Sequence, residues 1–248
     1  MAEPGGVRFE GVTLELPDGR RLLDGVTLDL QAGTTTALLG RSGSGKTTLL
    51  RTVNGLVRPT SGEIWVGKKL VKTAEVIALR RGIGYVIQET GLFPQMTAER
   101  NVGMALELAG QGKAEIARRA KELFGMVGLP FEELRARYPW QISGGQRQRL
   151  GLARALASDP AVLLMDEPFG ALDPMTRAEM QTMLRELLRT VGKTVLIVTH
   201  DLDEALFLAG RVVFLEGGRV VADLLAHEVM GSEQREVREY VGAVHRAV

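Results

Sequence analysis

Short apolar runs without alternation recur along the chain and predict strands that are buried on both faces of a sheet. These runs occupy residues 83–87, 162–165 and 194–198, and a further β-rich stretch occupies residues 34–39. Uninterrupted β-branched and aliphatic stretches of this length are typical of parallel strands covered by helices. The pattern therefore predicts an α/β protein with a doubly wound, mostly parallel sheet.

The first part of the chain has a different pattern. Residues 7–16 and 21–30 are strand-like, and Pro17, Asp18 and Gly19 between them are the residue types of a hairpin turn. We expect an N-terminal antiparallel β subdomain ahead of the parallel core.

Between Glu89 and Asp159 the apolar residues follow helical spacing. One such series ends at Gly128 and Pro130, which are common at the end of a helix, and consists of Ile116, Ala120, Leu123, Phe124 and Val127. A second amphipathic helix is predicted after Asp173 and Pro174, an N-cap followed by a first-turn proline. An inserted α-helical subdomain thus interrupts the α/β core.

These patterns divide the chain into three parts. Residues 1–88 and 159–220 form the expected α/β core with its antiparallel β flap, residues 89–158 the helical subdomain, and residues 221–248 a short C-terminal helical tail. The sequence contains no internal repeat and no low-complexity linker.

Composition narrows the class of protein. The 248 residues are 45% hydrophobic, which is enough for a packed core and argues against disorder. With 31 Lys and Arg against 30 Asp and Glu, the net charge of +1 provides no strong field for nucleic acid or an anionic membrane. There is no cysteine, so disulfides and thiolate metal sites are excluded. The first ten residues are neither basic nor apolar, which predicts no signal peptide, and no apolar run is long enough to span a bilayer.

A glycine loop after residues 34–39 matches the phosphate-binding pattern of Gly, four variable residues, Gly-Lys and Ser or Thr. It consists of Gly40, Arg41, Ser42, Gly43, Ser44, Gly45, Lys46 and Thr47, with Thr48 following. Glycines let backbone amides turn inward around an anion, and the predicted helix after the loop adds its dipole. Lys46 would reach the outer phosphates, and the Thr47 hydroxyl would bind Mg²⁺. The alternative, a glycine-rich turn with a surface lysine, does not account for the flanking strand and helix.

Two carboxylates, Asp166 and Glu167, follow the apolar run 162–165. Open α/β sheets bind ligands at the carboxyl ends of their strands. Asp166 would therefore hold Mg²⁺, and Glu167 would polarise the attacking water. Without the glycine loop such a pair would more often be a helix cap.

Residues 142–146, Ile-Ser-Gly-Gly-Gln, decide between families. Ser143 is predicted to cap the helix that carries Leu150, Leu152 and Leu156, and a capped helix start with bare glycine amides is itself an anion site. The segment resembles the signature motif of ATP-binding-cassette (ABC) proteins, with Ile142 in place of the usual leucine.

The resemblance extends over nearly the whole chain, and its five motifs occur in the family's order. Gln88 resembles the glutamine that contacts Mg²⁺ and links hydrolysis to the transmembrane subunit. Ala171, Leu172 and Asp173 resemble the D-loop, and His200 resembles the switch histidine that contacts the γ-phosphate.

The resemblance implies a P-loop NTPase core that hydrolyses ATP with Mg²⁺, and it assigns roles to matching residues. The implied catalytic residues are Glu167, His200 and Gln88, and the implied metal ligands are Thr47, Gln88 and Asp166. The implied nucleotide-binding residues are Gly40, Ser42, Gly43, Ser44, Gly45, Lys46, Thr47, Thr48, Ser143, Gly144, Gly145, Gln146 and Asp173. The family also implies a head-to-tail homodimer, in which each ATP lies between the Lys46 loop of one copy and the Ser143 segment of the other.

One position departs from the family. Most relatives have an aromatic residue that stacks on adenine just before the turn at residues 17–19, whereas this chain has Leu16. Phe9 or an arginine such as Arg20 could take over that contact.

Residues 88–97 and 166–174 are most similar to importer subunits for glycine betaine, choline or carnitine. That likeness implies a separate membrane permease, a solute-binding protein and a position at the cytoplasmic face of the inner membrane. Many such subunits continue into regulatory domains resembling cystathionine synthase, and the sequence as printed has none. A non-transport ABC ATPase that acts on ribosomes or DNA remains an alternative, although the near-neutral charge provides no face for nucleic acid. A P-loop kinase would not need the segment at Ser143.

Overall fold

The computed structural model describes residues 5–88, 90–170 and 172–244, which fall into two compact units. The middle unit is Arg81–Val191, and the two-segment unit comprises residues 5–80 and 192–244. The three-part division expected from the sequence separates parts by role and stays a prediction. Each unit is described by itself.

The two-segment unit begins with an antiparallel sheet of strand order β2-β1-β4-β5. Its strands are β1 (Val7–Glu15), β2 (Arg21–Leu30), β4 (Ser61–Val66) and β5 (Lys69–Leu70). Alternate apolar residues of β1 face the core, and Phe9 pairs in register with Leu28 and Ile64 while being 0% exposed. The predicted antiparallel β subdomain is confirmed.

A second sheet of this unit contains the parallel strands β9 (Arg211–Glu216), β3 (Thr35–Leu39) and β8 (Thr194–Val198). Antiparallel β10 (Arg219–Leu225) lies at the edge, next to β9. All residues of β8 are buried, as expected for a strand covered on both faces.

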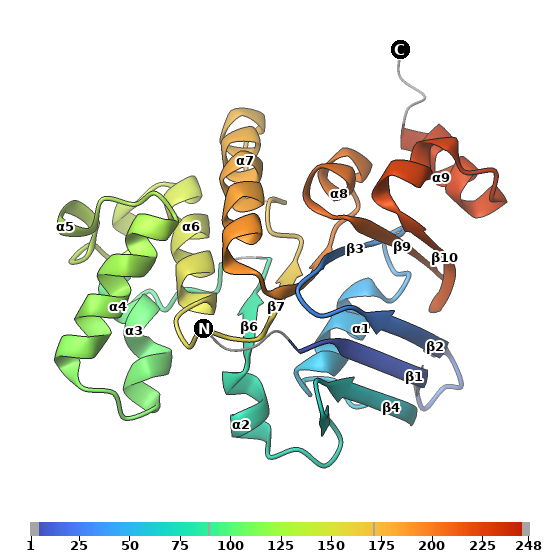
Figure 1. The fold of residues 1–248 in the computed structure, drawn as a ribbon, viewed down its shortest axis with the longest axis horizontal. Helices are drawn as coiled ribbons and strands as arrows, with labels where there is room; N and C mark the ends of the chain where they lie inside the picture. Colours follow the sequence, from blue (N-terminus) through green and yellow to red (C-terminus); the bar gives the residue numbers. More distant parts are fainter. Residues whose placement is uncertain (1–4, 89, 171, 245–248) are drawn as a thin grey trace. The chain divides into compact units, whose positions relative to one another are not determined.

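Helices pack against these parallel strands. A shared apolar cluster joins β3 and β9 to α8 (Leu202–Leu208) and α9 (Arg235–Val244) (Figure 1). Helix α1 (Lys46–Val53) packs against β2, β4 and β8. The short 3₁₀ helix η2 (Ala226–Gly231) lies between β10 and α9 in the chain, and α2 (Val76–Arg81) ends at the boundary of the unit.

The middle unit contains one pair of parallel strands, β6 (Ile83–Val86) and β7 (Val162–Asp166). Its helices are coloured green to orange in Figure 1 and are α3 (Ala98–Leu108), α4 (Lys113–Met126), α5 (Phe131–Leu134), η1 (Pro139–Gln141), α6 (Gly144–Ala155) and α7 (Pro174–Val191). Helix α6 packs against α3, α4, α7 and β6, so it is the centre of the unit.

The strands predicted near residues 83–87, 162–165 and 194–198 are present, with ends that differ by one residue at most. The two predicted amphipathic helices correspond to α4 and α7. Within residues 5–88, 90–170 and 172–244, no helix has both the length and the apolar character required to cross a membrane.

Candidate functional site

The glycine loop lies between β3 and α1 in the two-segment unit, as predicted, and it curls around the Lys46 side chain. Lys46 is 6% exposed, and its ammonium donates to the carbonyl oxygens of Gly40 at 2.7 Å and Arg41 at 2.9 Å. Gly40, Gly43 and Gly45 have φ values of 156°, 78° and 103°. The loop therefore presents a buried cation at the start of a helix.

Ser44 shows that the loop suits an anionic ligand. Its hydroxyl oxygen is buried, and the described part of the chain offers it no hydrogen-bond partner. An unsatisfied buried hydroxyl is unfavourable unless a ligand supplies the missing bond. Together with the Lys46 ammonium and the amino end of α1, this hydroxyl fits phosphate oxygens.

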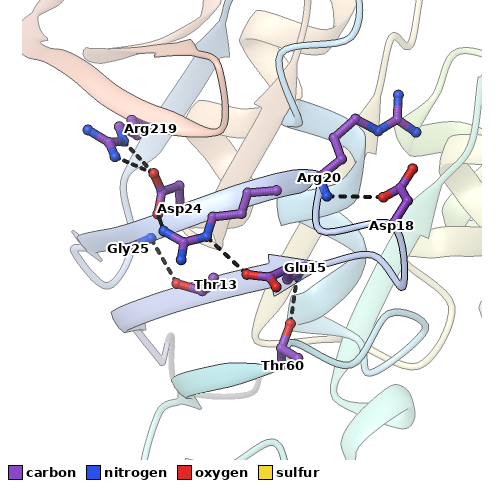
Figure 2. A network of polar contacts seen from close by, with 9 residues as sticks. Thr13, Glu15, Asp18, Arg20, Asp24, Gly25, Thr60 and Arg219 are labelled. Atoms are coloured by element: carbon purple, nitrogen blue, oxygen red, sulfur yellow. Dashed lines mark hydrogen bonds and ion pairs between the residues drawn. The ribbon is translucent and has the colours of Figure 1, made fainter.

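The turn between β9 and β10 is hydrogen-bonded to the backbone of the phosphate loop. The Gly218 N–H donates to the Ser44 carbonyl at 3.1 Å, and the Asp24 N–H donates to the Gly218 carbonyl at 2.9 Å. The Asp24 carboxylate accepts hydrogen bonds from two cations, Arg21 at 2.9 Å and Arg219 at 2.6 Å. Figure 2 shows its contact with Arg219. The hydrogen bond from Arg219, followed by that from Arg21, holds the pKa of Asp24 below its ordinary value. This polar network connects the antiparallel sheet to the backbone of the phosphate loop.

His200 belongs to the same unit as the loop and lies in the short connection between β8 and α8. The residue is exposed, whereas its neighbour Thr199 is 2% exposed. Asp201 caps α8 by accepting from the Glu204 N–H at 3.0 Å. The connection therefore keeps His200 at the surface between two fixed elements.

The hairpin tip contains Leu16, which is half-buried and bonded through its backbone to Arg20 and Gly19. The expectation that Phe9 could replace the missing aromatic contact is wrong, because Phe9 lies in the core with 0% of its surface exposed. The Arg20 side chain is exposed and extends away from the Asp24 network in Figure 2. Arg20 as a base contact remains a prediction.

In the middle unit, β7 ends at Asp166, as the sequence predicted. Asp166 is 3% exposed and accepts a hydrogen bond from the Tyr85 hydroxyl at 3.3 Å. The Gln88 side-chain amide donates to the Glu167 carboxylate at 3.4 Å. Glu167 has a φ of 46°, which is uncommon for a residue with a side chain and is found disproportionately at functional sites. The structure thus brings Gln88 and Glu167 together.

Ser143 is the N-cap of α6, as predicted. Its hydroxyl accepts from the Gln146 N–H at 3.2 Å, and the Gln146 side chain accepts from the Ser143 N–H at 2.9 Å. Ser143 and Gly144 are exposed, so the amino end of α6 is open to a ligand from outside the unit.

Two side chains on α6 reach the other motifs of this unit, and the sequence reasoning missed both. Gln148 is 4% exposed and donates to the Pro168 carbonyl, next to Glu167. Arg154 donates to the carbonyls of Thr90 at 2.9 Å and of Gly91, just after Gln88. Burial lowers the pKa of Arg154, which is a cost that its two backbone partners offset. The signal in the sequence that could have marked Gln148 and Arg154 is that they are polar residues in a helix rich in apolar residues.

Asp173 caps α7 by accepting from the Thr176 N–H at 3.1 Å. The hydrogen bond from the Thr176 side chain, followed by that from its N–H, lowers the pKa of Asp173. Ala171 and Glu89, which belong to two of the predicted motifs, lie outside the described residues. The predicted residues therefore form two groups, one around Lys46 and one around Glu167, and their chemical roles remain predictions.

A comparison with protein families agrees with this arrangement. The family model described as "ABC transporter" matches residues 23–170. That span begins in β2 and ends after Glu167, and it contains the glycine loop, Gln88 and the Ser143 segment.

Individual proteins are similar over longer stretches. The carnitine transport ATP-binding protein OpuCA of Listeria monocytogenes is 40% identical over 95% of this chain and 59% of its own length. The glycine betaine uptake system ATP-binding protein YehX of Escherichia coli is 46% identical over 87% of this chain and 69% of its own length. The chain spans about three fifths of the length of the first of these curated relatives.

Among solved structures, the ATP-binding cassette MJ0796 in a dimeric post-hydrolysis state with ADP and Pi superposes with a TM-score of 0.79. It is 33% identical, and the match covers 89% of this chain and 98% of that one.

Proposed function

The chain belongs to the ABC transporter family, and from this premise we propose that it is the ATP-hydrolysing subunit of a solute importer. The observation that carries the proposal is the phosphate loop, which combines the buried Lys46 with the buried Ser44 hydroxyl, for which the described residues offer no hydrogen-bond partner. The ligand with the matching chemistry is the triphosphate of ATP, and the amides of the loop from Gly40 to Thr48 bind it.

The remaining roles follow from chemical type. Thr47, Gln88 and Asp166 are hydroxyl, amide and carboxylate groups, which are oxygen donors that suit Mg²⁺. Mg²⁺ neutralises charge on the phosphate oxygens when it is bound. Glu167 accepts the proton of the attacking water, and Gln88, bonded to Glu167 at 3.4 Å, orients that carboxylate. His200 contacts the γ-phosphate.

The exposed amino end of α6 favours a working homodimer. Ser143, Gly144, Gly145 and Gln146 bind the γ-phosphate of the nucleotide held by the other copy, and Asp173 contributes from the start of α7. The related cassette MJ0796, whose solved structure is dimeric, supports this assembly. ATP then favours the closed dimer and hydrolysis reopens it, so the difference in affinity between the two states performs work.

We propose that residues 89–158 act as the helical subdomain and residues 1–88 and 159–220 as the nucleotide-binding core.

The partner and cargo follow from the similarity to OpuCA and YehX. A separate permease would hold the protein at the cytoplasmic face of the inner membrane, and a solute-binding protein would deliver glycine betaine, choline or carnitine.

Lys46→Ala tests the nucleotide site. Loss of the ammonium should abolish ATP binding measured by calorimetry, because the main cation facing the phosphates is removed. Lys68→Ala, which removes an exposed lysine of the same unit, is the matched control and should bind like wild type. Unchanged ATP affinity in Lys46→Ala, in a variant that keeps the far-ultraviolet spectrum of wild type, would refute the assignment.

The cargo has its own test. The subunit, reconstituted with its permease and solute-binding protein, should hydrolyse ATP faster when a quaternary-ammonium solute is added. Stimulation only by an amino acid or an inorganic anion would reject glycine betaine, choline and carnitine as the cargo. The assignment as an ATPase would not be affected.

A further inference from the structure

The C-terminal helix α9 contacts the connection that carries His200. Val237 on α9 is 0% exposed and belongs to the apolar cluster with α8 and β9. One turn further along, Tyr240 packs against the same cluster with its ring. Both residues follow the span matched by the family model, which ends at residue 170.

The Tyr240 hydroxyl donates a hydrogen bond to the main-chain carbonyl of His200 at 2.8 Å. Just before His200, the Thr199 N–H donates to the Leu38 carbonyl of β3 at 3.2 Å. The peptide unit that precedes Thr199 is therefore held by the core sheet, and the one that follows His200 is held by α9. A rotation of the second peptide unit would reorient the imidazole.

The Tyr240 ring is itself fixed in place. It contacts the Phe214 ring edge to face, with 5.5 Å between centroids. Tyr240, Gly40, Arg41 and Glu239 line one cavity of about 30 Å³, so α9 also borders the start of the phosphate loop. Burial raises the pKa of Tyr240 above its ordinary value, and the hydroxyl consequently stays protonated and able to donate near neutral pH.

We propose that Tyr240 is a positioning residue of the ATPase, which holds the main chain of His200 so that the imidazole is directed toward the bound phosphates. This inference rests on the proposed function of His200. It adds one residue of the C-terminal helix, through its hydroxyl, to the hydrolytic machinery.

The first test detects the contact without any nucleotide. Tyr240→Phe keeps the ring and its contact with Phe214 but removes the donor. The chain has three histidines, so their imidazole resonances can be followed one by one. We expect the His200 signal to shift and broaden in Tyr240→Phe, while the signal of exposed His227 on η2 stays in place. An unchanged His200 signal would overturn the proposal whether or not the protein is an ATPase.

The second test separates positioning from stability. Tyr240→Phe should lower kcat for ATP hydrolysis about fivefold to tenfold, the factor expected for one ordinary hydrogen bond, and leave ATP affinity within twofold. Val237→Ala loosens the same helix without touching the hydroxyl, so it should lower the unfolding temperature and keep kcat within twofold. Equal loss of kcat in both variants would show a purely structural role and overturn the proposal.

The variant His200→Ala, used as a background, separates the positioning role of Tyr240 from the proposed role of His200 in hydrolysis. Single-turnover rates measured over long times should be the same in His200→Ala with and without Tyr240→Phe, because the hydroxyl acts only through His200. A further fall in the double variant would overturn the positioning role. If His200→Ala alone hydrolyses ATP at the wild-type rate, the proposed role of His200 fails, and with it the kinetic part of this inference.

Discussion

Alanine at Gly45 and at Gly43 should have different effects on stability, although both glycines belong to the same phosphate loop. Gly43 has a φ of 78°, and a Cβ atom there would have no neighbour within 4 Å. Gly45 has a φ of 103°, and its Cβ would lie 2.6 Å from the Leu22 carbonyl oxygen. Of these two glycines, only Gly45 combines a left-handed backbone with a close approach of another strand.

The magnitudes follow from these two contributions. A side chain in a left-handed conformation costs about 1–2 kcal/mol, and the stiffer unfolded chain of an alanine variant offsets about 0.4–1 kcal/mol. Gly43→Ala should therefore lose about 1 kcal/mol. The overlap at Gly45 forces the loop away from β2, and crowding of this kind costs a further ~1–3 kcal/mol. Gly45→Ala should lose about 2–4 kcal/mol in total.

Urea unfolding measures the difference. The chain has two tryptophans, Trp65 in the two-segment unit and Trp140 in the middle unit. Trp140 is 62% exposed, so Trp140→Phe is a mild background in which fluorescence reports on the unit that holds the loop. With a slope of about 2 kcal/mol per molar urea, Gly45→Ala should unfold about 1 M earlier than Gly43→Ala. Equal midpoints would show that the approach of Leu22 to the loop does not constrain this position.

Three further predictions concern hydrolysis, base recognition and pH. Glu167→Gln should still bind ATP and elute as a dimer with ATP and Mg²⁺, because hydrolysis, which reopens the dimer, needs the Glu167 carboxylate as its base. A monomer under these conditions would contradict the head-to-tail dimer with ATP between the two copies. Wild type should bind ATP and GTP with similar affinity, and Leu16→Tyr should tighten ATP binding several-fold because an aromatic stacking contact is worth about 1–3 kcal/mol; a strong ATP preference that Leu16→Tyr does not increase would assign the base contact to Arg20 instead. Asp24 has a lowered pKa in the folded protein, so its ionised form stabilises the fold above the unfolded-chain pKa of about 3.9, and this contribution is lost as the pH falls through the folded value. Asp24→Asn should accordingly unfold earlier than wild type at pH 7 and together with it near pH 2, and a pH-independent difference would show that the hydrogen bonds from Arg219 and Arg21 do not depend on the charge.

Local features of this protein were determined by the sequence alone. The glycine loop before α1, the Ser143 cap of α6 and the Asp173 cap of α7 depend on neighbouring residues, and each is found where the sequence predicted it. The buried strands were recognisable for a similar reason, since a strand covered on both faces must be apolar throughout. The family motifs have this local character as well, which is why their order along the chain identified the family.

Tertiary structure decided the contacts between distant segments. Arg219 and Asp24 are 195 positions apart, and Tyr240 and His200 are 40 apart, so no local pattern marks either pair. The sequence around Arg154 does not show that its guanidinium is buried against the carbonyls of Thr90 and Gly91.

Phe9 is a residue for which the sequence suggested a contact that the tertiary structure excludes. As an aromatic residue near the hairpin it was a reasonable candidate for base stacking, and only its register between Leu28 and Ile64 reveals that it belongs to the core. Side-chain chemistry is a property of the sequence, whereas burial depends on which segments pack together. For this protein the sequence therefore determined which chemical groups are present, and the fold decided which of them are exposed and which support the others.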